Sequence, residues 1–224
     1  MKHITIAVPV RKWIGPESFS DEFRAFLKSL IKLAPGGYRF DLQVSVRDLC
    51  RARNEMVANV LNSAMDGILF VDDDMLPDAA DALAILDRDM PVVGALYCKK
   101  ENVAEYACNW RVGLNPVKKG AVRVLTLGCG FKYYHRDTFE TTAKKIPEHF
   151  YPAEKGATHY GWFQQRVVAH KFWTEDYFMD LLCEYCDIPV MVDTNVRIKH
   201  RDISDGKIYP LGDWPPIPPL EITV

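Results

Sequence analysis

The sequence predicts an α/β fold in which a mostly parallel sheet carries helices on both faces. Short apolar runs, typical of buried strands, alternate with segments whose apolar residues recur at helical spacing. The strand-like runs are nearly continuous in apolar character, which favours parallel strands covered on both faces. With 224 residues, the chain is long enough to form a single domain with a sizeable core.

The first half alternates regularly between the two patterns. A strand over residues 4–8 ends at Pro9, and the Ala34-Pro35-Gly36-Gly37 segment stops the first helix. Polar and turn residues bound the later elements in the same way. The expected order is strand 4–8, helix 23–31, strand 40–46, helix 48–64, strand 68–71, helix 78–87 and strand 91–97.

The second half is less regular. A loop-rich stretch over residues 147–173 carries many aromatic residues, and a long loop in a compact domain is often a lid or a binding loop. Trp162, Phe163 and Trp173 in this stretch fit either an acceptor platform or the packing of a lid. The remaining expected elements are strand 122–127, helix 137–145, helix 176–186, strands 189–193 and 196–200, and an extended proline-rich tail over 206–224.

Composition excludes several classes of protein. The formal net charge of −2 gives no global electrostatic reason to expect nucleic-acid binding, although a local patch formed by Lys99, Lys100, Arg111, Lys118, Lys119 and Arg123 competes with simple solvated charge. Six scattered cysteines indicate reduced, buried thiols, and the Cys183-x-x-Cys186 pair lacks the partners of a zinc site. No stretch has the length of a membrane span or the pattern of a signal peptide, so we expect a cytoplasmic protein.

The strand over Ile68–Val71 runs directly into Asp72-Asp73-Asp74. Ligands of parallel α/β sheets bind at the carboxyl ends of strands, which is where these three acids would lie. Adjacent carboxylates repel one another, and a hard divalent cation such as Mg²⁺ or Mn²⁺ relieves that repulsion. Such a cation would in turn hold a diphosphate. The competing interpretation is an acidic loop or a helix cap.

Further motifs follow one another in a fixed order around this triplet, and together they resemble the GT-A glycosyltransferases, in particular the large inverting family with its short phage and bacterial members. That family has Ala-Arg-Asn, a strand with Asp-x-Asp and a nearby Pro, a Gly-rich segment with Arg-Arg-x-x-Phe, then Glu-Asp and a late His. The matching segments here are Ala52-Arg53-Asn54, Asp72 to Pro77, Gly128-Cys129-Gly130, Arg136-Asp137-Thr138-Phe139 with one of the two arginines, Glu175-Asp176 and His200. The resemblance covers residues 1–205.

The resemblance implies a nucleotide-sugar donor, UDP-linked by expectation, and a Mn²⁺ or Mg²⁺ ion. Asp74 would bind the metal, Asp72 the metal or the ribose, and His200 would complete the coordination, which suits Mn²⁺. Asp73 occupies the position that varies in the family. The remaining donor-binding candidates are Pro9 and Val10 beside the nucleobase, Arg53 at the base or diphosphate, and Gly128 and Gly130, which would let the backbone approach a ligand or would simply form a turn. His200 and Arg53 also have ordinary interpretations, as a strand-end histidine and a surface charge.

Asp176 is the expected general base of an inverting transfer, with Glu175 beside it to bind the acceptor. Both acids also suit a helix N-terminus for purely structural reasons. A retaining transferase, a sugar-phosphate nucleotidyltransferase and a non-catalytic nucleotide-sugar-binding module remain alternatives. The acceptor is a glycan or a hydroxymethylated base of phage DNA, which would place the protein in the host cytoplasm, and the oligomeric state is open. Within one domain, residues 1–100 would bind the donor and 101–205 would face the acceptor.

Overall fold

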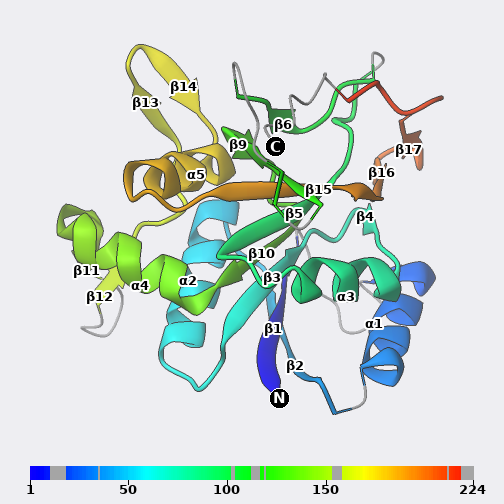
Figure 1. Ribbon diagram of the computed structural model, residues 1–224, viewed down its shortest axis with the longest axis horizontal. Helices are drawn as coiled ribbons and strands as arrows, with labels where there is room; N and C mark the ends of the chain where they lie inside the picture. Colours follow the sequence, from blue (N-terminus) through cyan, green and yellow to red (C-terminus); the bar gives the residue numbers. More distant parts are fainter. Residues whose placement is uncertain are drawn as a thin grey trace.

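In the computed structural model, one mixed sheet runs through the molecule and helices cover both of its faces (Figure 1). The structure describes residues 1–10, 19–34, 36–101, 104–111, 117–118, 120–152, 158–210 and 212–217. This arrangement confirms the predicted Rossmann-like α/β class. The eight strands lie in the order β2 (Tyr38–Ser45), β1 (Lys2–Pro9), β3 (Gly67–Val71), β10 (Phe131–His135), β5 (Val92–Leu96), β15 (Val190–Arg197), β8 (Ala121–Val124) and β7 (Val117–Lys118).

The sheet departs from the expected topology at its centre. Strands β2, β1 and β3 are parallel to one another, and β5 is parallel to β15. Between these two groups lies β10, which is antiparallel to both β3 and β5. The sequence pattern did not predict a strand over 131–135, because Lys132 interrupts its apolar character. The second half of the chain therefore contributes strands to the same sheet as the first.

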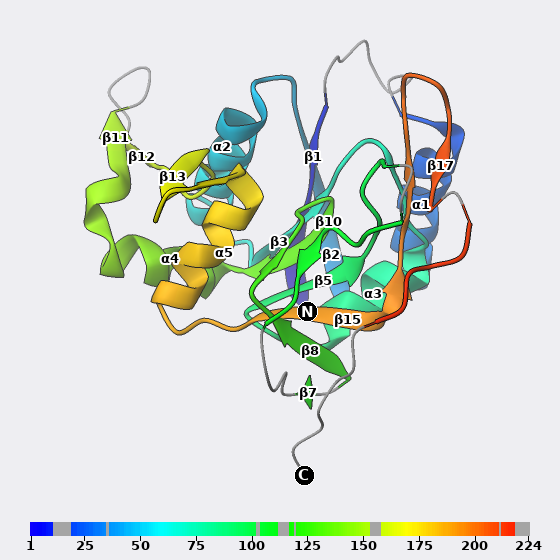
Figure 2. The same ribbon diagram turned by 90° about the horizontal axis from the view of Figure 1, so that it is seen from above.

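Within the described residues, five α-helices form the two outer layers. Helices α2, α4 and α5 lie on one face of the sheet and α1 and α3 on the other, as both views show (Figures 1 and 2). Their bounds are α1 (Asp21–Leu33), α2 (Leu49–Leu61), α3 (Ala79–Asp87), α4 (Arg136–Lys145) and α5 (Glu175–Tyr185), with a short 3-10 turn at Pro147–His149. All five lie within a few residues of the predicted helices.

The alternation of side chains along the strands builds two cores. In β3, Ile68 and Phe70 pack on the side of α2, α4 and α5, whereas Leu69 and Val71 pack on the side of α1 and α3. Successive residues of a strand point to opposite faces, so an entirely apolar strand is required when both faces are covered. This double burial explains why the run that precedes the acidic triplet contains no polar residue.

The loop-rich stretch is more ordered than predicted. It forms two short hairpins, and two further small sheets lie elsewhere. The hairpins pair β11 (Phe150–Pro152) with β12 (Thr158–Tyr160), and β13 (Arg166–Val168) with β14 (Lys171–Trp173). Of the other two sheets, one pairs β6 (Cys108–Asn109) with β9 (Thr126–Leu127). The other has three strands, with β16 (Lys199–Arg201) between β17 (Ile208–Tyr209) and β4 (Met75–Leu76).

The proline-rich tail forms the short strand β17 and then continues over 212–217 without helix or strand, and 218–224 lie outside the described residues. Its Trp214 ring stacks on Tyr106 at 6.2 Å between centroids. In the described part of the chain, no helix has both the length and the apolar character needed to cross a membrane.

Candidate functional site

The acidic triplet directly follows β3, on the side of the sheet where the carboxyl ends of β3 and of its parallel neighbour β1 lie. Because these strands are parallel, Pro9 and Val10 emerge beside Asp72. A cavity of about 220 Å³ opens there. Its lining consists of Pro9, Val10, Arg47, Leu49, Asp72, Asp73 and Asp74. Five of the predicted donor and metal residues thus share one cavity, together with Arg47 and Leu49, which the sequence analysis did not single out.

His200 reaches the triplet through a small sheet. Antiparallel pairing of β16 with β4 sets His200 opposite Met75, the neighbour of Asp74. The Nδ1 atom of His200 lies 3.0 Å from the carbonyl oxygen of Cys98, so this nitrogen carries the hydrogen and donates it. The Nε2 atom then faces Asp74 Oδ1 at 3.3 Å.

Asp74 has two differently surrounded oxygens. Its Oδ2 accepts a 2.6 Å hydrogen bond from Lys100 Nζ, whereas its Oδ1 is buried and has no hydrogen-bond partner among the described residues. Burial raises the pKa of Asp74, but His200 and Lys100 outweigh burial and lower it to about 2. The carboxylate is therefore ionised at neutral pH, and its Oδ1 can face either a proton on His200 Nε2 or a cation.

Oδ1 of Asp74 and Nε2 of His200 form a pair of electron donors that face each other. Their approach is favourable when a proton on Nε2 or a metal ion lies between them. A histidine whose other ring nitrogen is fixed by a carbonyl is the usual form of a metal ligand. Among the described residues, no three His, Cys, Asp or Glu side chains converge into a ready-made metal cluster. The residues present thus fit an ion that takes two protein ligands and completes its coordination from a substrate or water.

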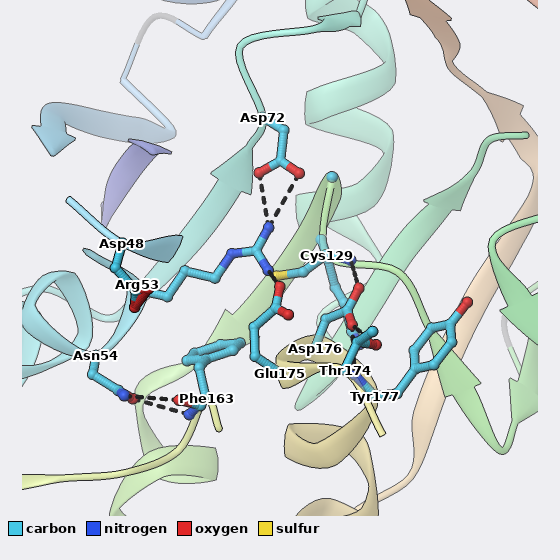
Figure 3. A network of polar contacts seen from close by, with 12 residues as sticks. Asp48, Arg53, Asn54, Asp72, Cys129, Phe163, Thr174, Glu175, Asp176 and Tyr177 are labelled. Carbon is cyan, nitrogen blue, oxygen red and sulfur yellow. Dashed lines mark hydrogen bonds and ion pairs between the residues drawn. The ribbon is translucent and has the colours of Figure 1, made fainter. Parts of the chain in front are cut away.

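Arg53 connects the two predicted halves of the site (Figure 3). Its guanidinium donates to both oxygens of Asp72, at 2.9 and 3.1 Å, and to Glu175 Oε1 at 2.6 Å. The side chain is buried between the rings of Phe70 and Phe163, each 5.8 Å from its charged carbon. Arg53 is therefore neither a surface charge nor a residue that faces the cavity, and the expected contact of Arg53 with a nucleotide finds no support in this geometry.

Arg53 belongs to helix α2, and neighbouring residues of this helix fix its position. Asp48 caps this helix by accepting from the backbone of Arg51 at 3.1 Å. The next residue after Arg53, Asn54, makes a two-way bond with Phe163, since its amide donates to the carbonyl and accepts from the backbone N–H, both at 2.9 Å. The Ala-Arg-Asn motif thus supplies a buried cation, Arg53, and a side chain, Asn54, that binds the backbone of Phe163.

Glu175 and Asp176 open helix α5, as predicted. Glu175 is buried against Arg53, and burial raises the pKa of Glu175 although Arg53 opposes this effect. Asp176 is half-buried, and its Oδ1 accepts from the Thr174 hydroxyl at 2.6 Å and from the Tyr177 backbone at 2.8 Å. The longer contact of Asp176 is from Cys129 N to Oδ2, at 3.3 Å. Hence Asp176 is fixed in orientation and keeps Oδ2 as its less occupied oxygen.

A buried ion pair lies beneath this helix start. Lys132 of β10 donates to Asp180 Oδ1 at 2.5 Å and to the carbonyl of Leu127 at 2.9 Å. Asp180 Oδ2 accepts from Leu127 N at 2.7 Å. Both side chains have zero exposure. The pair therefore ties α5 to the segment that carries Gly128, Cys129 and Gly130.

The two glycines of that segment, Gly128 and Gly130, leave space for neighbouring side chains inside the protein. A Cβ atom at Gly128 would lie 2.0 Å from the hydroxyl of Tyr97, and one at Gly130 would lie 2.3 Å from the end of Met75. The Gly130 backbone also donates to the Tyr97 hydroxyl at 3.1 Å. These positions require glycine because Tyr97 and Met75 fill the space, and the expected approach of their backbone to a ligand finds no support here.

Other expectations resolve in favour of packing. Trp162, Phe163 and Trp173 are buried in the core next to α2, α4 and α5 and form no exposed platform. All six cysteines are free, including Cys183 and Cys186. Most of the candidate basic patch is paired with acids: Lys99 with Glu105, Lys100 with Asp74, and Arg111 and Arg123 with Glu184. The side chains of Lys118 and Lys119 lie outside the described residues.

Comparison with known proteins supports the fold. No family model matches the chain, and neither does any curated protein. Among solved structures, protein A197 from STIV matches over 97% of this chain and 98% of its own, with a TM-score of 0.53 and 14% identity. A mannose-1-phosphate geranyltransferase from Thermus thermophilus matches 66% of this chain and 61% of its own, with a TM-score of 0.41 and 17% identity.

A nucleoside-diphosphate-sugar pyrophosphorylase from Vibrio cholerae matches 87% of this chain and 92% of its own, with a TM-score of 0.39 and 8% identity. Of the three, only the likeness to the STIV protein indicates the fold, and at 14% identity it indicates nothing further. The chain shares its Rossmann-like α/β fold with the STIV protein over nearly the full length of both.

Proposed function

We propose that this protein is a metal-dependent glycosyltransferase that moves a sugar from a nucleoside diphosphate, UDP by preference, to an acceptor hydroxyl. The observation that carries the proposal is the meeting of Asp72, Asp74 and His200 at one edge of the sheet, beside a cavity and next to the helix start that bears Asp176. Sequence order alone suggested this grouping, and the geometry of the described residues is consistent with it.

The donor would lie in the cavity between the ends of β1 and β3. Pro9, Val10 and Leu49 are the less polar residues of its lining and suit a nucleobase, and the three acids belong to the same lining. Asp74 Oδ1 and His200 Nε2 would hold the metal ion. When bound, Mn²⁺ would neutralise the charge that builds on the departing diphosphate. Asp72, already held by Arg53 on one side, would contact the ribose or the ion.

Asp176 would act as the base. Its Oδ2 would take the proton from the acceptor hydroxyl while that oxygen forms a bond with the anomeric carbon, and the electron pair of the broken bond would leave with the diphosphate. The hydrogen bonds from Thr174 and Tyr177 to Oδ1 fix the carboxylate, so that the same oxygen faces each acceptor. A displacement with one base inverts the anomeric centre. Glu175, which is buried on Arg53, would position Asp176 and leave direct acceptor contact to other groups.

The proposal is tested by incubating the full chain with UDP-, GDP-, dTDP- and ADP-sugars in Mn²⁺, Mg²⁺ or EDTA, and by quantifying the nucleoside diphosphate released. We expect release from one donor class, dependent on metal. Pyrophosphate formed from a sugar phosphate and a nucleoside triphosphate would instead indicate a nucleotidyltransferase. Binding of a donor without any turnover, with every acceptor offered, would leave a binding module.

The acceptor follows from the same preparation. The preferred donor is combined with oligosaccharides and with duplex DNA that contains hydroxymethylated pyrimidines, and labelled products are identified by mass spectrometry. NMR of the new linkage then decides the stereochemistry, since a retained anomeric configuration contradicts the mechanism with Asp176 as single base.

A further inference from the structure

Lys100 contacts the acidic triplet of this site, and the proposed function gives it no role. It follows β5 in the chain, and its Nζ lies 2.6 Å from Asp74 Oδ2. Its side chain keeps 19% of its exposure, whereas that of Asp74 keeps 10%. The ammonium group thus contacts the acidic triplet, on a side chain that is partly exposed.

Because of Lys100, the two oxygens of the Asp74 carboxylate have different partners. The ammonium takes Oδ2, and Oδ1 remains for a cation shared with His200. Any divalent ion at Oδ1 would therefore bind next to a fixed positive charge, which weakens its binding. An anion at the same place would instead be attracted by that charge.

We infer that Lys100 is a diphosphate-binding residue, which adds a cation next to the acidic triplet and lets a nucleoside diphosphate bind in part without metal. The inference deepens the proposed function and rests on it. Lysine is suited to the role because its ammonium is a compact charge with three donors, of which the contact with Asp74 uses one. The remaining donors are available to phosphate oxygens.

This role makes two predictions of opposite sign. Loss of the charge in Lys100→Met should strengthen Mn²⁺ binding in the absence of nucleotide, because the repulsion is removed. The same change should weaken UDP binding in EDTA, because the attraction is removed. A lysine that merely held Asp74 in place would lose Mn²⁺ affinity on substitution, so the sign of the metal effect separates the two roles.

The experiment measures both affinities by isothermal titration calorimetry, for the wild-type chain, Lys100→Met, Lys100→Arg and Lys99→Met. Lys99 is the matched control, since it is the adjacent lysine and pairs with Glu105 away from the triplet. We expect about tenfold tighter Mn²⁺ binding and about tenfold weaker metal-free UDP binding in Lys100→Met, where tenfold corresponds to about 1.4 kcal/mol. Lys100→Arg and Lys99→Met should stay close to wild type.

Several outcomes overturn the inference. Mn²⁺ and UDP affinities that fall together in Lys100→Met indicate a structural lysine, and affinities equal to those of Lys99→Met indicate no role. Wild-type protein that binds UDP with Mn²⁺ but not in EDTA refutes the inference and preserves the proposed function. Wild-type protein that binds no nucleoside diphosphate in either condition refutes the proposed function itself. Lys100→Gln, a shorter neutral side chain, replaces Lys100→Met if circular dichroism shows that the latter is unfolded.

Discussion

Two networks of cations and carboxylates lie close together in this protein, and they differ in how far their side chains are exposed to solvent. The first joins Arg53 to Asp72 and Glu175, and the second joins Lys132 to Asp180. In the second network both side chains are sealed from solvent and each charged group has several partners. In the first, Asp72 keeps 24% of its side-chain exposure and lines the cavity.

We interpret the sealed network as one that stabilises the fold and the open network as one that can contact a ligand. Burial without compensation is costly for a charge, so the sealed pair must remain intact for the fold to persist. The open network can exchange a protein partner for a ligand, because water and solutes reach Asp72. We therefore expect substitutions in the sealed network to change stability, and substitutions around the open network to change activity and binding.

The largest effect is expected for Asp74→Asn. This change should abolish Mn²⁺-dependent transfer while the chain still folds, with a loss of stability limited to the contacts of Asp74 with Lys100 and His200. The measurement is nucleoside diphosphate release in Mn²⁺, with circular dichroism as the check of folding. Asp73→Asn is the control from the same triplet and should retain more activity. Full turnover in Asp74→Asn would contradict the metal assignment.

Asp176→Asn should lower kcat by a factor on the order of 10²–10⁴, the range typical for loss of a general base. Donor binding should change little, since this carboxylate faces the acceptor. Asp137→Asn is the matched control, because Asp137 is also the second residue of its helix, α4, but lies exposed. Equal losses of kcat in both variants would indicate a helix-terminal effect in place of base catalysis.

Lys132→Met tests the sealed network. It leaves the Asp180 carboxylate buried without its cation, which should lower the free energy of unfolding by about 3–5 kcal/mol. Urea denaturation measures this loss. Lys145→Met, at a lysine that also donates to a backbone carbonyl but is exposed, should cost far less. If the two variants lose the same stability, the distinction between sealed and open networks fails.

UDP binding tests the open network at the level of stability. At about 100 times its dissociation constant, a ligand of the folded state stabilises it by about 2.7 kcal/mol, which raises Tm by roughly 5–10 °C for a chain of this size. UDP with Mn²⁺ should give this shift, and UDP in EDTA a smaller one. Equal shifts in both conditions, seen by differential scanning fluorimetry, would argue against a diphosphate bridged by metal.

We also expect Asp180 to make the free energy of unfolding depend on pH. Burial raises its pKa from 3.8 to about 6 although Lys132 acts in the opposite direction. Between these two values the folded state binds more protons than the unfolded state, so this group stabilises the fold most below pH 3.8 and its contribution is lost as the pH rises through 6. The change is on the order of 3 kcal/mol. Urea denaturation from pH 4 to 7 should show this slope in wild type but not in Asp180→Asn.

Local sequence patterns were sufficient to predict most of the elements and the position of the acidic triplet in the fold. An apolar run that ends in three acids predicts a buried strand with carboxylates at its carboxyl end, and β3 with Asp72 to Asp74 has that form. The start of α5 at Glu175 was predicted within one residue, because acids gather in the first turn of a helix. Such features depend on neighbours within a few residues, so local periodicity is sufficient to find them.

Which charges meet depends instead on the tertiary structure. No prediction was made for residues 131–135, yet β10 lies in the middle of the sheet, where Asp180, 48 residues away, accepts the charge of Lys132. Arg53 finds Glu175 across 122 residues, and Lys100 finds Asp74 across 26. A buried ion pair is stable only when both partners arrive with the right geometry, and that requirement leaves no trace in the local pattern of either partner.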